Sequence, residues 1–407
     1  MAFKACLALA ALARAVDALS DAPSPDNFVR RGTTAAAVLG NYVYVDGGEI
    51  SQYENGKIGN PASVTVNSTL SIDMSKSWTA GTVTIRTIPK TGPRKTNVQV
   101  WADPDTNSFY SWGGKWIGGV NMTKTELWKF TADGSGGGAW SVQDPANPNV
   151  FGGLIPGEFS AYTTAKGSGF LIGGIASGWT EIYRAKTQTI PGMLTFNIKS
   201  KVWENGTFSA GFSPFDTLSG ASAQYVPTFG PNGLILVFGG WSPRVDAEPD
   251  IKVSPVFDLQ NITFFDPETK KKYSQVTTGD VPPSPRGRFC TVGFEREGGY
   301  DIFLFGGMNQ RAQTNFDDAY ILSLPGFVWT KMPQNPAGNR AEHSCVAVGN
   351  RQVLSIGGTD MSWTKNDPAK QGLLLFDMTA MKWSDSYDAG AAAYEAPDTI
   401  KSWYTKK

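Results

Sequence analysis

Charged residues that could bind or act on a ligand precede the first strand of most of six repeated segments. Arginines predominate, and a guanidinium can hold a carboxylate, a sulfate or a sugar acid through paired N–H donors. The set comprises Arg30, Arg31, Arg94, Glu158, Arg286, Arg288, Arg340, Glu342 and the chain's single histidine, His343. Two roles fit the arginines: ligand binding, or the favoured one, pairing with carbonyls and carboxylates between repeats. We expect His343 to be a hydrogen-bonded structural residue.

Metal-dependent and nucleophilic catalysis find little support in these residues. A copper centre of the galactose-oxidase kind needs two histidine ligands, and the chain has one histidine. Zinc and non-haem iron sites usually draw on two or more His or Cys residues, and the carboxylates show no metal-ligand spacing. The sequence contains no Gly-X-Ser-X-Gly motif. We therefore predict no metal and no cofactor.

Glycine pairs define the elements that must position these residues. They are Gly47-Gly48, Gly113-Gly114, Gly173-Gly174, Gly239-Gly240, Gly306-Gly307 and Gly357-Gly358. The steps between them are 66, 60, 66, 67 and 51 residues, so one structural unit repeats along almost the whole chain. Because glycine has no Cβ, each pair can turn sharply and let a neighbouring unit's aromatic ring approach the backbone.

Each unit holds about four strands. An alternating stretch and an apolar run precede the glycine pair, and a variable loop and another apolar strand follow it. A large aromatic residue then comes in each unit: Trp78, Trp140, Trp203, Tyr273, Trp329 and Trp383. We expect these rings to fill the space between units. Four strands at this period predict an all-β fold, a six-bladed β-propeller with four antiparallel strands per blade.

The hydrophobic run, glycine pair, aromatic strand and Trp resemble kelch repeats over roughly residues 28 to 388. More narrowly, residues 322–329, Phe289-Cys290, His343-Ser344-Cys345 and residues 383–387 look like the kelch-repeat ectodomains of filamentous fungi. Many members of that group carry a transmembrane helix and a cytoplasmic tail after the propeller. This sequence stops at Lys407 without either, so we expect a departure from that plan or the ectodomain alone.

The expected domain plan is one propeller over residues 19–407. Its blades fall at about residues 28–90, 91–155, 156–215, 216–283, 284–335 and 336–390, and residues 391–407 form a C-terminal tail. Such a ring must close, because an unpaired first blade would expose strand edges. Residues 22–30 or the tail from Ala391 to Tyr404 are the alternatives for the closing strand.

Residues 1–18 are interpreted as a signal peptide. Lys4 precedes the apolar run from Ala5 to Ala13, and Val16 and Ala18 suit cleavage after Ala18. A transit peptide is the competing interpretation. Lys plus Arg equals Asp plus Glu at 36 each, which leaves no net field to attract nucleic acid or anionic lipid. No later stretch approaches 18 apolar residues, so we expect a secreted monomer with no membrane span.

Cys290 and Cys345 remain once Cys6 leaves with the signal peptide. They occupy matching positions in neighbouring blades when the insertion at residues 296–300 is allowed for. Inner strands of adjacent blades run close, so a disulfide is geometrically possible, and two buried thiols are the equal alternative. Asn67, Asn121, Asn205 and Asn261 are candidate N-glycosylation sites, although about three would occur by chance.

Ligand contact is expected on the long loops between the second and third strand of each blade. In an antiparallel meander these loops share one face with the segments that precede each first strand. The loops carry Tyr53, Trp179, Tyr183, Arg184, Trp241, Arg244, Arg311 and Trp363. Together with Arg30, Arg94, Arg286, Arg288 and Arg340, most of them form our candidate set for binding a protein or a glycan.

The kelch resemblance also implies an enzymatic alternative, a sugar mutarotase or epimerase. Arg340, Glu342 and His343 are the residues that would carry proton transfer. Because Glu342 and His343 are adjacent, a strand would point them to opposite faces and keep them out of one pocket. The favoured expectation is therefore a binding scaffold that is not an enzyme.

Overall fold

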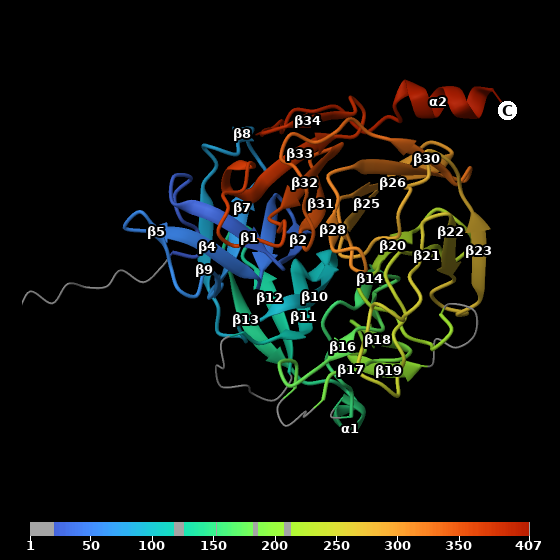
Figure 1. Cartoon of the computed structure of the whole chain (residues 1–407), viewed down its shortest axis with the longest axis horizontal. Coiled ribbons are helices and arrows are strands. Elements are labelled where there is room, and N and C mark those ends of the chain that lie inside the picture. Colours follow the sequence, from blue (N-terminus) through green and yellow to red (C-terminus); the bar gives the residue numbers. More distant parts are fainter. Residues whose placement is uncertain (1–19, 118–125, 152, 182–185, 207–212, 407) are drawn as a thin grey trace, which may run out of the picture.

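Sheets of antiparallel strands surround a central axis (Figure 1). This computed structural model describes residues 20–406 except 118–125, 152, 182–185 and 207–212. Among the described residues, six sheets are each built from four strands that follow one another in the chain, as in the blades of a propeller. The innermost strands β2, β10, β14, β20, β25 and β31 contact one another in that order, and β31 contacts β2 again. The predicted all-β propeller architecture is confirmed.

The blades have the following strands. Blade one contains β2 (Ala35–Leu39), β3 (Tyr42–Asp46), β7 (Ser68–Asp73) and β9 (Ile85–Pro89). Blade two contains β10 (Thr96–Asp103), β11 (Ser108–Lys115), β12 (Leu127–Ala132) and β13 (Gly138–Gln143). Blade three contains β14 (Ala161–Ala165), β15 (Ser168–Ile172), β18 (Met193–Asn197) and β19 (Val202–Gly206).

The second half of the ring repeats this plan. Blade four contains β20 (Ser222–Val226), β21 (Leu234–Phe238), β22 (Asn261–Phe265) and β23 (Lys272–Val276). Blade five contains β25 (Cys290–Arg296), β26 (Gly299–Phe305), β29 (Ala319–Leu324) and β30 (Val328–Lys331), with β24 (Thr278–Gly279) added parallel to β30. Blade six contains β31 (Ser344–Val348), β32 (Gln352–Ile356), β33 (Leu373–Asp377) and β34 (Lys382–Ser384).

Short strands and helices extend the blades. β1 (Phe28–Gly32) pairs with β4 (Glu49–Glu54), which also pairs with β5 (Lys57–Ile58) and β6 (Val64–Thr65). Two further pairs are β16 (Ile175–Ala176) with β17 (Gln188–Thr189), and β27 (Met308–Asn309) with β28 (Thr314–Asn315). The helices are α1 (Pro148–Phe151), α2 (Asp398–Thr405) and the 3₁₀ turns η1 (Pro104–Thr106) and η2 (Lys370–Gly372). No helix in the described part of the chain is long and apolar enough to cross a membrane.

Closure of the ring differs from both predicted alternatives. Neither terminal segment adds a fourth strand, because blades one and six each draw all four strands from their own stretch of chain. Instead β8 (Trp78–Thr79) pairs with β35 (Ser386–Tyr387), which joins the first blade to the end of the last. The tail after residue 390 packs its helix against blades five and six, where Ile400 is buried with Phe303 and Phe376.

Glycine pairs join the blades through backbone hydrogen bonds. The second glycine of every pair donates its N–H to a carbonyl just before the next blade, at 2.7–3.0 Å, and Gly358 closes the circle on Arg31. Both glycines of each pair have positive φ, and a Cβ on Gly239 would lie 2.3 Å from the Arg286 carbonyl oxygen. The group that approaches the first glycine is therefore mainly a neighbouring carbonyl, not the aromatic ring we expected.

Most of the predicted tryptophans do fill the space between blades. Trp140 donates to Thr69 Oγ1, Trp329 to the Leu259 carbonyl and Trp383 to the Pro333 carbonyl, each in the preceding blade. Trp203 packs on Trp112 of blade two, with ring centroids 5.1 Å apart. Tyr273 is the exception: it stacks on Phe264 of its own blade and is 39% exposed, so its predicted core role is wrong.

Candidate functional site

Two buried arginines, Arg286 and Arg340, hold the loops of their own blades in place. Arg286 pairs with Asp318 at 2.5 Å and donates to the Gly306 carbonyl, and its guanidinium lies 4.0 Å from the Phe316 ring centroid. Arg340 pairs with Asp367 at 3.0 Å and donates to the Gly357 carbonyl. Their side chains are 0% and 1% exposed. Both side chains pair with a carbonyl and a carboxylate, but these partners lie within blades five and six and not between blades, where the sequence predicted them.

The arginines near the N-terminus are placed differently from one another. Arg30 is buried and donates to the carbonyls of Gly358, Lys365 and Asn366. Arg31 is buried as well, and it donates to the Asp21 carbonyl. Burial lowers the pKa of Arg31 to about 10, against a smaller opposing effect of the Asp21 charge. Arg94 is exposed on the surface.

A ring of residues with positive φ forms the mouth of the central channel. One residue at the start of the inner strand of each blade, or two positions before it, has this conformation: Thr33, Asn97, Phe159, Gly220, Arg288 and Glu342. Five of the six blade junctions carry a backbone N–H to C=O hydrogen bond between these residues, at 2.7–3.0 Å. At the remaining junction the Gln99 side-chain amide donates to the Asn97 carbonyl. Positive φ is costly for Thr and Phe, and such strain is often found at functional sites.

Side chains of the mouth form one charged and aromatic cluster. The Arg288 guanidinium lies 3.9 Å from the centroid of the Phe159 ring and forms an ion pair with Glu342. Lys115 Nζ lies 3.1 Å from Glu158 and 5.6 Å from the Phe159 centroid. An aromatic face flanked by paired charges is suited to stack on a ligand and to hydrogen-bond its polar groups.

Two carboxyls at the mouth titrate above their usual range. Burial raises the pKa of Glu158, against the opposing effects of Lys115 and Arg288 and with a further small rise from Glu342. Burial also raises the pKa of Glu49, which accepts a hydrogen bond from Ser63 at 2.8 Å. The mouth therefore combines partly buried acids and bases in a single polar cluster.

A cavity of about 290 Å³ continues from the mouth down the channel. Its upper wall includes Phe159, Arg288 and Glu342, and its sides are the inner faces of the first strands. This volume is at the lower end of the range that holds small ligands. The polar and aromatic mouth thus opens into a space large enough for a small polar group.

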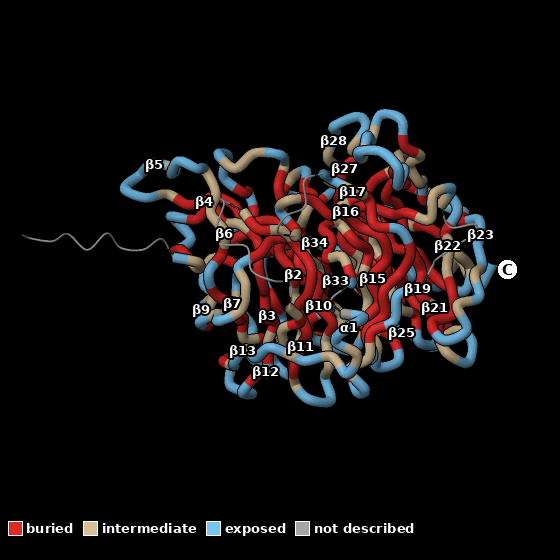
Figure 2. Tube along the Cα trace, turned by 90° about the horizontal axis from the view of Figure 1, so that it is seen from below, coloured by how far each residue is buried: buried red, intermediate tan, exposed pale blue. Residues whose placement is uncertain are grey.

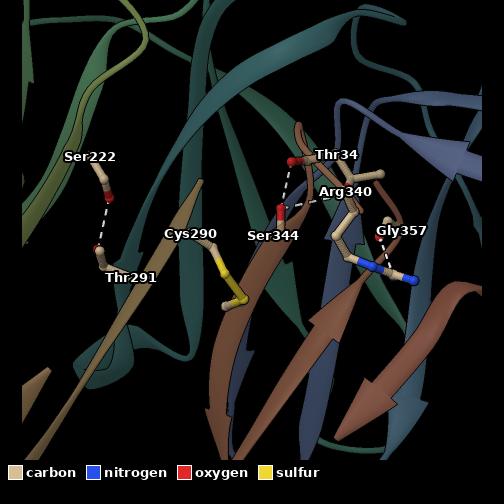
Figure 3. Close-up of a disulfide and its surroundings, with 8 residues drawn as sticks. Thr34, Ser222, Cys290, Thr291, Arg340, Ser344 and Gly357 are labelled. Atoms are coloured by element: carbon tan, nitrogen blue, oxygen red, sulfur yellow. Dashed lines mark hydrogen bonds between the residues drawn. A yellow bond between two sulfur atoms is a disulfide. The ribbon is translucent and has the colours of Figure 1, made fainter. Parts of the chain in front are cut away.

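Side-chain links join the inner strands around this cavity (Figure 3). Ser222 Oγ and Thr291 Oγ1 lie 2.7 Å apart between blades four and five, and Ser344 donates to the Thr34 carbonyl between blades six and one. Between blades five and six the link is covalent: Cys290 and Cys345 form a disulfide, with their Cα atoms 5.6 Å apart. Both cysteines lie at the start of an inner strand, as their sequence positions indicated.

The three candidate catalytic residues do not form one site. Arg340 is held by Asp367, and Glu342 is engaged by Arg288 at the mouth. Glu342 and His343 nevertheless line the same cavity, because both precede the strand that begins at Ser344 and Glu342 has a φ of 59°. Their side chains lie apart, since that of Glu342 pairs with Arg288 and that of His343 packs on Phe305.

His343 is buried beside the Phe305 ring, with the ring centroids 5.1 Å apart. Burial lowers its pKa to about 3, the Arg340 charge adds to this, and the Phe305 backbone opposes it. The opposing effect comes from a hydrogen bond with the Phe305 backbone. His343 is therefore a neutral, buried imidazole near neutral pH, held beside Phe305.

Some of the candidate ligand-binding residues on the loops pack against other residues, and others are exposed to solvent. Trp241 is buried in a ladder with Ser219 and Val256, and Trp363 packs on Gly32. Tyr53 donates to Asn366 Oδ1. Arg311 donates to the carbonyls of Ile251 and Ser254, which ties together the loops of blades four and five.

Trp179 and Arg244 are exposed, as is Arg311. Trp179 is 53% exposed. Arg244 forms an exposed pair with Asp246 at 2.6 Å. Tyr183 and Arg184 lie outside the described residues, as do the predicted signal peptide and Asn121. The other glycosylation candidates, Asn67, Asn205 and Asn261, are exposed.

Sequence reasoning missed Phe159, Lys115 and Glu49 as members of the mouth cluster. Alignment of the repeats on their inner strands would have placed Phe159 in the same column as Arg288 and Glu342. The glycine pairs do not give this column directly, because Thr33 lies 14 residues before Gly47 whereas Gly220 lies 19 before Gly239. The hairpins between the mouth residue and the glycine pair vary in length, so counting a fixed number of residues back from the glycine pair does not find the mouth residue.

Comparisons with known proteins agree with this architecture. A solved structure titled "Structure of YjhT" superposes with a TM-score of 0.58 at 12% identity, covering 89% of this chain and 99% of that one. The ring of four-stranded sheets and this likeness define the chain as a β-propeller.

The sequence comparison finds one curated relative. A kelch repeat-containing protein of Arthroderma benhamiae is 24% identical over 420 residues, which cover 90% of this chain and 58% of that protein. No family model matches the sequence. The chain is similar to this kelch repeat-containing protein over most of its own length, and it spans somewhat more than half the length of that curated relative.

Proposed function

We propose that this chain is an interaction scaffold that binds a protein or glycan partner through the face formed by its Gly-Gly loops, outside the cell or at its surface. The observation that carries the proposal is the exposure of large apolar side chains on these loops. Four of the eight such side chains among the described residues lie there: Trp179, Val245, Val253 and Met361. Trp and Met side chains are enriched in the contact surfaces of protein interfaces.

The hydrogen-bonded structure within the loops supports the same face as the binding surface. β4 with β5, β16 with β17, and β27 with β28 give several of the loops hydrogen-bonded structure of their own. Figure 2 shows the tips around β5 and β28 exposed along one face of the molecule, above a buried propeller. Recognition residues on a rigid framework lose little conformational entropy when a partner binds.

The channel mouth lies on this face, since the loop glycines bond to the segments that lead into the mouth. A glycan residue could stack on Phe159 while its hydroxyls bond Glu158 and Lys115, as sugars commonly combine a ring face with polar groups. A protein partner would use the loop tips, where Trp179 is the largest exposed ring.

A glycan array and a pull-down from extracellular material, both with the folded chain, test the proposal. A Trp179→Ala, Met361→Ala double variant should weaken protein binding by about 30-fold or more, the cost of losing an interface hot spot. Phe159→Ala should weaken glycan binding. The matched control is Tyr273→Ala with Val276→Ala, which removes similarly exposed groups from β23. Loss of binding in the control, or no ligand on either assay, contradicts the proposal.

Sugar mutarotation is the second function to be measured. Glu158 and Lys115 at the mouth are the acid–base pair that such chemistry would use here, because His343 is neutral and buried. NMR exchange between sugar anomers should proceed no faster with the protein than in buffer if the chain only binds. Secretion is tested separately by N-terminal sequencing of protein recovered from culture medium, with residue 19 as the expected first residue.

A further inference from the structure

We propose that reduction of the Cys290–Cys345 disulfide turns this link into a metal site, in which Cys290, Cys345 and His343 bind a thiophilic cation such as Zn²⁺. The proposal is independent of the binding function above. It rests on a cluster that lies below the mouth, on the wall of the central cavity.

Three ligand atoms meet at this point of the wall. The two sulfurs and a ring nitrogen of His343 all lie within 4.8 Å of one another. Tetrahedral zinc with bonds of about 2.3 Å to sulfur and about 2.0 Å to nitrogen places its ligand atoms roughly 3.5–3.8 Å apart. Side-chain rotation within the existing backbone spacing is therefore enough to open the disulfide around a cation.

His343 is prepared for such a role. His343 is 7% exposed, and its ring packs on that of Phe305, with the ring centroids 5.1 Å apart. A histidine ring nitrogen is a common zinc ligand, and here it lies beside both sulfurs.

The surroundings suit a cation with two thiolates. A divalent charge is balanced by the two sulfurs, and the nearby Arg340 is already neutralised by Asp367 at 3.0 Å. All three ligands line the cavity of about 290 Å³, so the metal has a path from the mouth and a fourth position for water. Cys₂His with one open position is a known zinc ligand set.

The chemical step balances with a dithiol as the reductant. The dithiol gives two electrons and two protons to the disulfide, the S–S bond breaks, and the reductant becomes a cyclic disulfide. Metal binding then displaces one proton from each thiol as two metal–sulfur bonds and one metal–nitrogen bond form. Oxidised and metal-bound states both link blade five to blade six.

The structure itself supplies the matched control. Ser222 and Thr291 form a hydroxyl link at the equivalent positions of blades four and five. A Cys290→Ser, Cys345→Thr variant copies that link and removes both sulfur ligands without leaving a gap. Cys6→Ser should be present in every protein tested, so that no other thiol contributes.

Cobalt titration tests the proposal. Full-length protein is reduced with dithiothreitol, freed of it by gel filtration without oxygen, checked for two thiols, and titrated with Co²⁺ and then Zn²⁺. We expect one Co²⁺ per chain with a thiolate-to-cobalt charge-transfer band, bleached by Zn²⁺. Oxidised protein and the Ser/Thr control should show no band, and His343→Asn should weaken binding by more than ~10-fold.

Several results would contradict the proposal. They are reduced protein that binds no metal, binding that His343→Asn leaves unchanged, and loss of the circular dichroism of the fold on reduction. A band of equal strength in the Ser/Thr control would likewise place the metal elsewhere.

Discussion

At the scale of single residues, one position in each blade has a shared backbone role that its side chain does not reveal. The residue two before each mouth residue is Arg31, Lys95, Gly157, Leu218, Arg286 or Arg340, and its carbonyl accepts the N–H of a Gly-Gly loop in every blade. Sequence reasoning recognised the arginines because they carry charge. It could not recognise Leu218 or Gly157 as their equivalents, because what the six share is a main-chain oxygen.

His343 gives a pH prediction at this scale. Its folded pKa of about 3 lies below its ordinary value of 6.5, so the unfolded chain binds a proton more readily. The stability it contributes is complete above pH 6.5 and is lost as pH falls toward 3. From pH 7 to pH 5 the free energy of unfolding should drop by about 2 kcal/mol from this group.

Urea unfolding at both pH values, with wild type and His343→Asn, measures this effect. The variant should lack that part of the drop. Glu49 and Glu158, whose pKa values are raised by burial, act in the opposite direction but are present in both proteins, so they cancel in the comparison. Equal pH dependence in the two proteins would contradict a neutral buried histidine.

At the scale of elements, strands and their order follow from local pattern. Apolar alternation, glycine pairs and tryptophans recur in each blade, and these marked four strands per blade correctly because each depends on neighbours in the chain. Tyr273 differs because an aromatic ring on an outer strand can be buried or exposed with the same local pattern. The left-handed mouth residues were missed for a related reason, since Thr33 and Phe159 are unlike the glycines that usually mark positive φ.

A substitution at Gly239 tests the contact between the first glycine of a pair and the neighbouring carbonyl. Gly239→Ala should lower the free energy of unfolding by at least about 2 kcal/mol more than Gly230→Ala, measured by urea denaturation. Both glycines have positive φ, 59° and 71°. An added Cβ meets the Arg286 carbonyl oxygen at 2.3 Å in the first case and nothing within 4 Å in the second. Equal losses would mean that φ alone explains the glycine pair.

At the scale of the whole molecule, a disulfide and the C-terminal tail both strengthen the junction of blades five and six. The Cys290–Cys345 disulfide lies on the inner side. Further out, the tail contributes Ile400 to the core and Tyr394, whose hydroxyl donates to Asp301 at 2.7 Å. The sequence indicated a ring and a tail, but contacts between residues a hundred positions apart leave no local pattern, so it could not say where the tail packs.

Packing of the C-terminal tail makes the stability of the fold sensitive to Ile400. Ile400→Ala should lower the free energy of unfolding by about 2–5 kcal/mol, because the side chain is 2% exposed among rings from both blades. Thr405→Ala, on the exposed end of the same helix, is the control and should change little. Thermal unfolding followed by circular dichroism measures both, and an unaffected Ile400→Ala protein would show that the tail is dispensable.

The ring of residues with positive φ also determines the electrostatic character of the mouth of the central channel. Its N–H to C=O bonds run around the axis from blade to blade, so their peptide dipoles circulate and largely cancel along the channel. Unlike a helix terminus, this entrance has little inherent polarity of its own. Its preference for cationic, anionic or neutral ligands is then set by the side chains at Thr33, Asn97, Phe159, Gly220, Arg288 and Glu342. Relatives could exchange those six for a new ligand and leave the closure of the propeller intact.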